Sequence, residues 1–600
     1  MAHETRIPRR EELDRAECWS TEDLFPSDEA WSRAFEACQS LPGELAAFRG
    51  KLGESAQSLY EYLEFNERLD ERMEPLYIYA MLRHDENTAD PQYQAMQGRC
   101  FSFGVEMGRA GAYAGPELTA IPEETLEGFY AQLPALEKYR RYLTKARLER
   151  EHILSPAEED LLAGTGELSR GPSSVYTSYT NADMKFPSVV DSEGREHPVS
   201  NGAFLSLLES PDRTLRENAF KSVYGVYGAS RNALAAMLDA QVRTDIFYAR
   251  ARKYPSALAS ALFPSEVPEE VYHNLLTAVH QNLDKLHRYM ALRKKVLGLE
   301  ELHTYDLYTS MLPEADQPVS FQQAREEVLE ATRVLGEEYH RVLASSFDQR
   351  WMDIRENEGK RSGAYSCGCR VHPFVLLNHK DTLGSEFTLA HEMGHAMHSY
   401  LSNKNQPTVY SGYVLFVAEV ASTCNEALLM QYLLGRTEDK KRRAVLINYF
   451  LEQFRTTLYR QAMFAEFELK IHELAERGET LTAQRLCEIY LDINKTYYGP
   501  DVAADPEIAL EWSRIPHFYR RFYVYQYATG FSAAMALSKR ILEGGEEAVR
   551  DYLKFLSGGC SADPVSLLKM AGVDMSTPKP VNDALEFFGA LIGELEELLQ

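Results

Sequence analysis

The sequence predicts a mainly α-helical fold with one small β-sheet, and three observations lead to this prediction. Apolar residues recur at intervals of three and four over most of the 600 residues, as they do on one face of a helix. The same stretches are rich in Leu, Ala, Glu, Arg and Gln, which are good helix formers. Only two segments break this pattern in a way that favours strands. The composition, 44% hydrophobic and 26% charged, fits a large globular protein.

The helical periodicity runs through much of the chain. It predicts helices at 55–85, 91–113, 123–147, 211–251, 267–298, 320–345, 384–404, 414–435, 440–478 and 519–542. A further helix start is marked by Ser155 before Pro156, with acidic side chains in the turn that follows. Proline suits the first position of a helix because the N–H that it lacks would have no partner there. We therefore expect another helix to begin at Pro156.

The two strand-like segments lie far apart in the chain. Residues 184–200 place Asp-Ser-Glu-Gly between β-branched runs, which predicts a hairpin. Residues 359–379 combine glycines with an alternating and then apolar run, which predicts two strands of a small sheet just before the helix at 384–404. No Pro/Ser-rich linker separates clear domains. The turn-rich stretch near 200–210 is the softest boundary, and it divides an N-terminal helical region, 1–205, from a second region, 206–600.

Charge and cysteine content narrow the classes of function. With 64 basic and 90 acidic residues the chain has a net charge of −26, so nucleic acid and membrane surfaces are poor partners. No apolar run approaches the roughly 18 residues of a membrane span, and the N-terminus has no apolar stretch typical of a secretory signal. The scattered cysteines predict reduced thiols, and Cys367-Gly-Cys369 has neither the usual zinc spacing nor that of a redox pair. We expect a cytoplasmic protein.

Two histidines and a glutamate stand close together in the segment TLAHEMGHAMHSY. His391 and His395 are four residues apart, so on a helix they project from the same face one turn apart and can bind one zinc ion at about 2.0–2.1 Å each. Glu392 lies one residue round, where a general base for a zinc-bound water belongs. The plainer alternative is an ordinary helix with two histidines. Apolar or small neighbours predict that this helix is buried, and buried polar groups need partners.

A catalytic zinc site needs a third protein ligand, and the sequence offers two candidates. His398 lies seven residues from His391, which is roughly 10 Å along a helix and too far to share one ion, so we expect a packing or outer role. Glu419 lies on the next predicted helix in a nearly all-apolar stretch, where a carboxylate must be neutralised, ion-paired or bound to metal. We predict Glu419 as the third ligand and Glu426 as a partner that orients a liganding histidine.

The motifs together resemble the oligoendopeptidase F branch of the thimet oligopeptidase superfamily. HEMGH followed by FVAEVASTCNEALL carries the resemblance, with PFVLLNHKDTLGSEFTLAHEMGH before it, IPHFYRRFYVYQYATG after it, and NADMKFPSVVDSEG and HILSPAEEDLLA in the N-terminal third. It covers nearly the whole chain. The resemblance implies a helical body split by a deep channel with zinc on its floor, one wall formed by 1–205, and zinc ligands at His391, His395 and Glu419.

The segment IPHFYRRFYVYQYATG is dense in histidine and tyrosine side chains that could donate hydrogen bonds to an oxyanion. An aromatic run of this kind is more often core packing, but buried tyrosine hydroxyls need partners. The resemblance implies that a His and Tyr residues from this region lie over the scissile carbonyl. His517 matches the histidine, Tyr527 is the first candidate among the tyrosines and Tyr525 the second. The resemblance also places Gly363-Ala-Tyr-Ser366 on a strand beside the cleft.

The predicted function is a zinc-dependent endopeptidase that cleaves internal bonds of short unfolded oligopeptides, with one Zn²⁺ per chain. In this prediction Glu392 is the general base, and His517 and a tyrosine stabilise the oxyanion. A zinc exopeptidase on a similar channel, a peptide-binding holdase with a vestigial metal site and a helical scaffold for protein partners stay open as alternatives. Oligopeptides are the expected partners, without nucleic acid or membrane, and the sequence predicts no particular oligomeric state.

Overall fold

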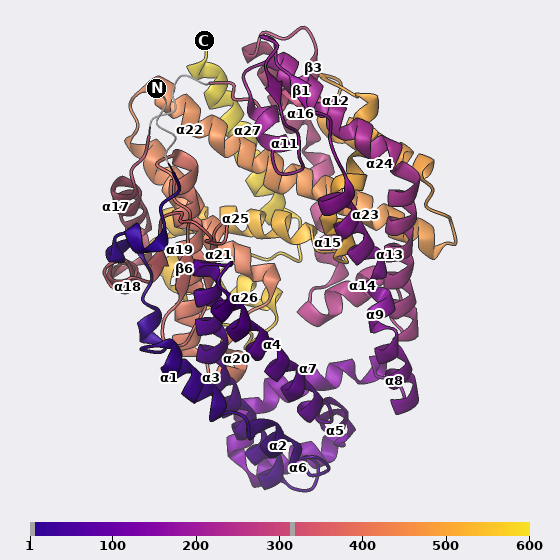
Figure 1. Ribbon diagram of the computed structural model, residues 1–600, viewed down its shortest axis with the longest axis vertical. Helices are drawn as coiled ribbons and strands as arrows, with labels where there is room; N and C mark the ends of the chain where they lie inside the picture. The colour runs from indigo at the N-terminus through magenta and orange to yellow at the C-terminus, as the bar shows by residue number, and fades with distance from the viewer. Residues whose placement is uncertain (1–5, 313–317) are drawn as a thin grey trace. The chain divides into compact units, whose positions relative to one another are not determined.

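The computed structural model describes residues 6–312 and 318–600, and helices dominate it (Figure 1). The chain divides into two compact units, each built from three separate segments. As far as they are described, the first unit holds Met1–Glu151, Gln317–Leu433 and Leu537–Gly572, and the second holds His152–Asp316, Leu434–Ala536 and Val573–Gln600. The predicted boundary at 205/206 divides the chain into two continuous regions, whereas each of these units combines three segments. That boundary stays a prediction. Among the described helices, none combines the length and the apolar character of a membrane span.

The helices of the first unit include those predicted at 55–85, 91–113, 384–404 and 414–435, and shorter ones that were not predicted. They are α1 (Asp28–Glu36), α2 (Leu41–Ala46), α3 (Ala56–Glu86), α4 (Pro91–Gly111), α5 (Ala114–Ala120), α6 (Glu123–Gln132), α7 (Arg140–Leu148), α17 (Phe321–Ala331), α18 (Glu337–Asp348), α19 (Leu383–Asn405), α20 (Thr408–Ser411), α21 (Leu415–Arg436) up to Leu433, the later part of α25 (Tyr525–Leu556) and α26 (Pro564–Met570). The predicted helix at 123–147 is interrupted by a 3-10 turn that begins at Pro134, because proline lacks the N–H that a helix interior needs. Another 3-10 turn and Gly336 divide the stretch predicted at 320–345.

The helices of the second unit include two predicted stretches that are split. They are α8 (Pro156–Gly164), α9 (Gly166–Ser169), α10 (Gly171–Ser178), α11 (Phe204–Glu209), α12 (Arg213–Ala229), α13 (Arg231–Ala251), α14 (Ala257–Leu262), α15 (Glu269–Gln281), α16 (Leu283–Val296), α22 (Lys440–Gln453), α23 (Arg460–Glu476), α24 (Ala483–Tyr498), the first part of α25 and α27 (Lys579–Leu598). Breaks at Ser230 and Asn282 divide the stretches predicted at 211–251 and 267–298. The start predicted at Pro156 is confirmed, and Glu158 accepts a hydrogen bond from the Ser155 N–H at 2.9 Å.

Both strand predictions are confirmed. Strands β1 (Val189–Val190) and β2 (Glu196–His197) form the antiparallel hairpin. Strands β5 (Tyr365–Cys367) and β6 (Phe374–Leu376) pair antiparallel, and β4 (Met352–Asp353) adds a parallel partner on the other side of β6, so β5 is an edge strand. Helix α19 packs against β5 and β6. A two-residue pairing of β3 (Leu302–His303) with β7 (Val502–Ala503) was not predicted, because such short strands leave no periodic signal.

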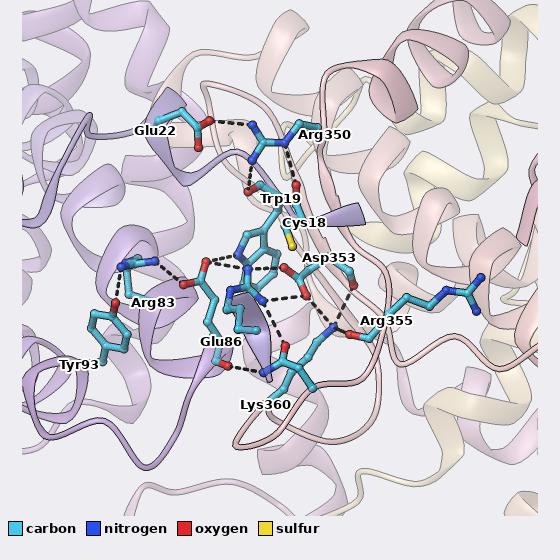
Figure 2. A network of polar contacts seen from close by, with 12 residues as sticks. Cys18, Trp19, Glu22, Arg83, Glu86, Tyr93, Arg350, Asp353, Arg355 and Lys360 are labelled. Atoms are coloured by element: carbon cyan, nitrogen blue, oxygen red, sulfur yellow. Dashed lines mark hydrogen bonds and ion pairs between the residues drawn. The ribbon is translucent and has the colours of Figure 1, made fainter. Parts of the chain in front are cut away.

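A network of buried charges ties the N-terminal segment to this sheet in the first unit (Figure 2). Asp353, on β4, accepts from the Arg10 guanidinium at 2.6 Å and pairs with the Lys360 ammonium at 2.7 Å. The Lys360 side chain is fully buried and also donates to the backbone oxygens of Asp353, Arg355 and Leu377. Burial lowers the pKa of Lys360, and the Asp353 carboxylate opposes that shift. The ammonium thus joins the end of β6, just upstream of α19, to β4.

Replacing Lys360 with Met is expected to weaken this part of the first unit by about 3–5 kcal/mol, because it leaves a buried carboxylate with less than its full complement of partners. Hydrogen–deuterium exchange over 350–380 measures the loss of protection directly. Lys404→Met is the control, because Lys404 pairs with Glu338 at the surface and a surface pair contributes about 0–1 kcal/mol. Equal exchange in the two variants would contradict the structural role given to Lys360.

Candidate metal centre

Helix α19 carries His391 and His395 on one face, as the four-residue spacing predicts. Thr382 caps the helix by accepting from the Ser385 N–H, and Leu389, Ala390 and Met393 are fully buried beside the histidines. The two imidazole rings lie with their centroids 4.8 Å apart in an edge-on arrangement. Both rings extend from a buried helix, and their nitrogen atoms point toward the same position.

Glu419, on α21, reaches the same point. Its Oε2 lies 3.3 Å from Nε2 of His391 and 3.6 Å from Nε2 of His395. Two ligands on one tetrahedral ion at about 2.1 Å are separated by about 3.4 Å, which both distances match. Two imidazoles and a carboxylate also form a donor set typical of catalytic zinc, and no other cluster of His, Cys, Asp and Glu in the described residues offers comparable ligands. The residues therefore fit a single divalent ion.

Gly394 allows the two helices to approach closely enough for this arrangement. A side-chain carbon at position 394 would lie 2.6 Å from Cα of Ser422 and 2.7 Å from the Ala421 carbonyl oxygen, so any larger residue would push α21 away. Asn425 strengthens the same contact by donating to the Ala390 carbonyl at 3.3 Å. The sequence analysis missed Gly394, although a glycine inside a buried helix was a signal of close packing.

Glu426 and Ser422 each form a hydrogen bond with a candidate ligand of the metal centre. Glu426 Oε1 lies 2.6 Å from Nδ1 of His391, which leaves Nε2 to face the metal position. Ser422 Oγ donates to Glu419 Oε2 at 3.3 Å. Burial opposes ionisation of Glu419, but hydrogen bonds from His391 and His395 outweigh it and hold the pKa of Glu419 well below its usual range. The predicted contact between Glu426 and one of the paired histidines is present, and the role of His391 as a ligand stays a prediction.

Removal of the Glu426 side chain is expected to lower metal affinity or activity about 10- to 100-fold, because His391 loses the group that fixes its ring. Competition with a chromophoric chelator measures the affinity of Glu426→Ala for zinc. Glu426→Gln keeps an acceptor for Nδ1 and is expected to lose less. An Ala variant with the affinity of the unchanged protein would show that Glu426 does not orient His391.

Glu392 has the surroundings of a proton acceptor. Its side chain is 7% exposed, and its Oε2 is buried without a hydrogen-bond partner among the described residues. Burial raises the pKa of Glu392, and the neighbouring histidines oppose the rise. A carboxylate with a raised pKa and an unused acceptor atom beside a metal position is suited to take a proton from water.

His398 belongs to the packing of the first unit rather than to the ligand set. Its ring stacks on Tyr413 with centroids 3.8 Å apart and also lies against Phe555. Burial, with a smaller effect from His395, lowers the pKa of His398 to about 3, so the ring stays neutral. Of the two roles that the sequence left open for His398, packing is the one that these contacts support.

The histidine and tyrosines that were predicted to stabilise the oxyanion lie in the second unit. His517 belongs to a 3-10 turn, Pro516–Tyr519, and its ring lies 6.0 Å from that of Tyr523 and 6.1 Å from that of Tyr527. The hydroxyls of Tyr527 and Tyr523 are 3.4 Å apart. These three side chains are half-buried. Tyr525 does not join them: it is 2% exposed and packs on Tyr272, because two residues along a helix turn it to another face.

Comparisons with known proteins identify relatives over the whole chain. The sequence profile of Peptidase family M3 matches residues 206–587, and that of Oligopeptidase F matches residues 117–186. Oligopeptidase PepF of Bacillus subtilis is 45% identical over 603 residues, which cover 100% of this chain and 90% of the relative. An oligoendopeptidase F homolog of Lactococcus lactis is 39% identical, with 98% of both chains covered.

A solved structure shows the same fold. The crystal structure of oligoendopeptidase-F from Enterococcus faecium matches with a TM-score of 0.74 and 36% identity, covering 97% of this chain and 99% of that chain. The likeness therefore extends over both units of the chain, including the helix with the paired histidines. The chain belongs to peptidase family M3, whose members are metallopeptidases.

Proposed function

We propose that the protein is a zinc-dependent endopeptidase that cleaves internal bonds of short, unfolded peptides and carries one zinc ion per chain. The observation that carries the proposal is the placement of Glu392. Its buried Oε2 has no donor among the described residues, and the residue adjoins three ligand atoms whose spacing suits one tetrahedral ion. The names of the relatives, oligopeptidase and oligoendopeptidase, support the choice of peptide substrates.

The residues of the first unit have separate tasks in the proposed reaction. A zinc ion on His391, His395 and Glu419 would act as a Lewis acid and lower the pKa of a bound water. Glu392 would accept a proton from the attacking water and return it to the leaving amine. Glu426 holds the His391 ring in the orientation that presents Nε2. No cysteine or serine nucleophile takes part, so thiol reagents should spare the activity.

His517 and Tyr527 are proposed as donors to the oxyanion, in line with the resemblance of this segment to its family. Both carry N–H or O–H groups on half-buried side chains, as donors to a substrate must. Burial, with Arg520 adding to it, lowers the pKa of His517, so its imidazole is a neutral donor at pH 7. Tyr523 shares the cluster and is a further candidate, whereas Tyr525 is buried against Tyr272 and is not carried forward.

The edge strand β5 is proposed to bind the peptide backbone. Among the described strands only β6 pairs with it, on one side, and its residues Tyr365, Ser366 and Cys367 are half-buried. An extended peptide can add to such an edge through main-chain hydrogen bonds, which give affinity without reading side chains. Broad sequence tolerance for unfolded peptides follows from this mode of binding.

Mass spectrometry of a peptide library, incubated with and without a chelator, tests the proposal. We expect internal cleavage that the chelator abolishes and added zinc restores. Peptides blocked at both ends should be cleaved as well as free ones. Cleavage confined to peptides with a free terminus would favour an exopeptidase, and cleavage that survives complete removal of the metal would refute the proposed mechanism.

A further inference from the structure

The loop that carries His517 and the tyrosines has an unusual backbone conformation at Phe522. Its φ is 47°, in the left-handed region that a bulky L-residue avoids. Such a conformation persists only where the surroundings enforce it, and residues of this kind cluster at functional sites. Phe522 lies directly before Tyr523 and three residues before α25, which carries Tyr527. Its conformation therefore fixes the direction in which the backbone enters Tyr523 and the start of α25.

Glu468, on α23, holds this conformation from inside the second unit. Its Oε1 accepts a hydrogen bond from the Phe522 N–H at 2.7 Å. The side chain is fully buried, and its Oε2 has no hydrogen-bond partner among the described residues. Burial, reinforced by Asp245, raises the pKa of Glu468 well above its usual range, which favours the neutral acid. A buried acid without a cationic partner is costly to keep, and nothing in the proposed reaction uses it.

Side-chain contacts around Phe522 hold the same part of the loop. The Phe522 ring lies 4.6 Å from the His472 ring and 5.8 Å from that of Tyr272, centroid to centroid. His472 donates through Nδ1 to the Glu468 carbonyl oxygen at 2.8 Å. Beside it, Arg521 donates to Ser260 Oγ at 3.1 Å. The backbone of the loop is thus held by one buried acceptor, and its side chains by rings and a hydroxyl of the same unit.

We propose that Glu468 is a positioning residue: by accepting the Phe522 amide it fixes the left-handed turn that aims Tyr523 and Tyr527 into their cluster with His517. It touches neither substrate nor metal. This inference rests on the proposed function, because it assigns Glu468 a task in aiming the donors to the oxyanion. A change in this turn would alter the cluster, because the rings of Tyr523 and Tyr527 lie only 5.5 Å apart and both lie near the ring of His517.

Two substitutions of Glu468 distinguish the effect of its hydrogen-bond acceptor from the effect of its side-chain volume. Glu468→Gln keeps a neutral acceptor for the Phe522 N–H, so kcat should stay within about 3-fold of the unchanged protein. Glu468→Met keeps the volume but removes the acceptor, and misaimed donors should lower kcat roughly 10- to 100-fold with little change in KM. Equal kcat values for Gln and Met variants would overturn the inference.

A control excludes a general loss of stability as the cause. Tyr289→Phe removes part-buried hydrogen bonds of the second unit, to Glu452 and Asn448, which lie outside the loop and its contacts. It should lower Tm to a similar extent as Glu468→Met while kcat is retained. If kcat falls in Tyr289→Phe in proportion to its loss of Tm, as in Glu468→Met, the effect at Glu468 is structural and the inference fails.

A double-mutant cycle with Tyr527→Phe shows whether Glu468 acts through the tyrosine. Once the Tyr527 hydroxyl is gone, Glu468→Met should lower kcat by only about 3-fold or less, because coupled residues are not additive. If the effects of Glu468→Met and Tyr527→Phe on kcat are fully additive, the inference is overturned, although the role proposed for Tyr527 is unaffected. If Tyr527→Phe alone leaves kcat unchanged, the role proposed for Tyr527 fails instead, and the two failures are told apart.

Discussion

Glu392→Gln is expected to lower kcat/KM by about 10²–10⁴-fold, the usual contribution of a positioned general base. The amide matches the carboxylate in size and cannot accept a proton, so the change removes the proposed chemistry with little change in packing. The fall should lie mainly in kcat, because Glu392 acts on the reacting water rather than on the binding of the peptide. Steady-state cleavage of an internally quenched peptide measures both constants.

The metal content of the same variant separates catalysis from binding. Glu392 is not among the three residues that are placed to hold a metal ion, so Glu392→Gln should contain as much zinc as the unchanged protein by elemental analysis. Turnover by this variant at the unchanged rate would end its assignment as the base. Loss of both zinc and activity would instead make Glu392 part of the metal site.

Glu419→Ala is expected to abolish both zinc binding at low metal concentrations and peptidase activity. The two imidazoles would be left to hold the ion alone, and three protein ligands are the rule for catalytic zinc. Equilibrium dialysis against buffered zinc measures the loss of affinity. Excess zinc should restore little activity, because the ion would also lack the negative charge of the carboxylate.

His398→Phe is the matched control, since His398 was the other candidate for the third ligand and lies on the same helix as His395. Phenylalanine preserves the stack on Tyr413, so zinc content and kcat/KM should stay near those of the unchanged protein. The assignment of the third ligand would be reversed if His398→Phe lost zinc and Glu419→Ala kept it.

Much of this arrangement was predictable because the signals were local. Helix periodicity located α3, α19 and α21, and the turn chemistry around Gly194 located the hairpin of β1 and β2. Glu419 was predictable because a carboxylate in an otherwise apolar helix needs a charged partner. The breaks at Ser230 and Asn282 were missed because the helices on either side of each break both bury an apolar face. The spacing of apolar residues therefore continues across the break.

The remainder depends on contacts between distant parts of the chain, which a local pattern does not reveal. Gly394 matters because of Ser422 on another helix, and Lys360 because of backbone oxygens near Asp353 and Leu377. The local pattern gave no reason of its own to rank Tyr527 above Tyr525, since the buried face of their helix was not yet defined. Tertiary packing placed Tyr525 against Tyr272 instead.

Zinc K-edge X-ray absorption of the metal-loaded protein tests the central claim most directly, because it reports the ligands of the bound ion. The account predicts one zinc per chain, four-coordinate, with two imidazoles and a carboxylate oxygen at about 2.0–2.2 Å. Glu419→Ala should remove the signal or change its ligand shell. Sulfur scattering at about 2.3 Å, which only cysteine ligands would give, or the absence of imidazole scattering would contradict it.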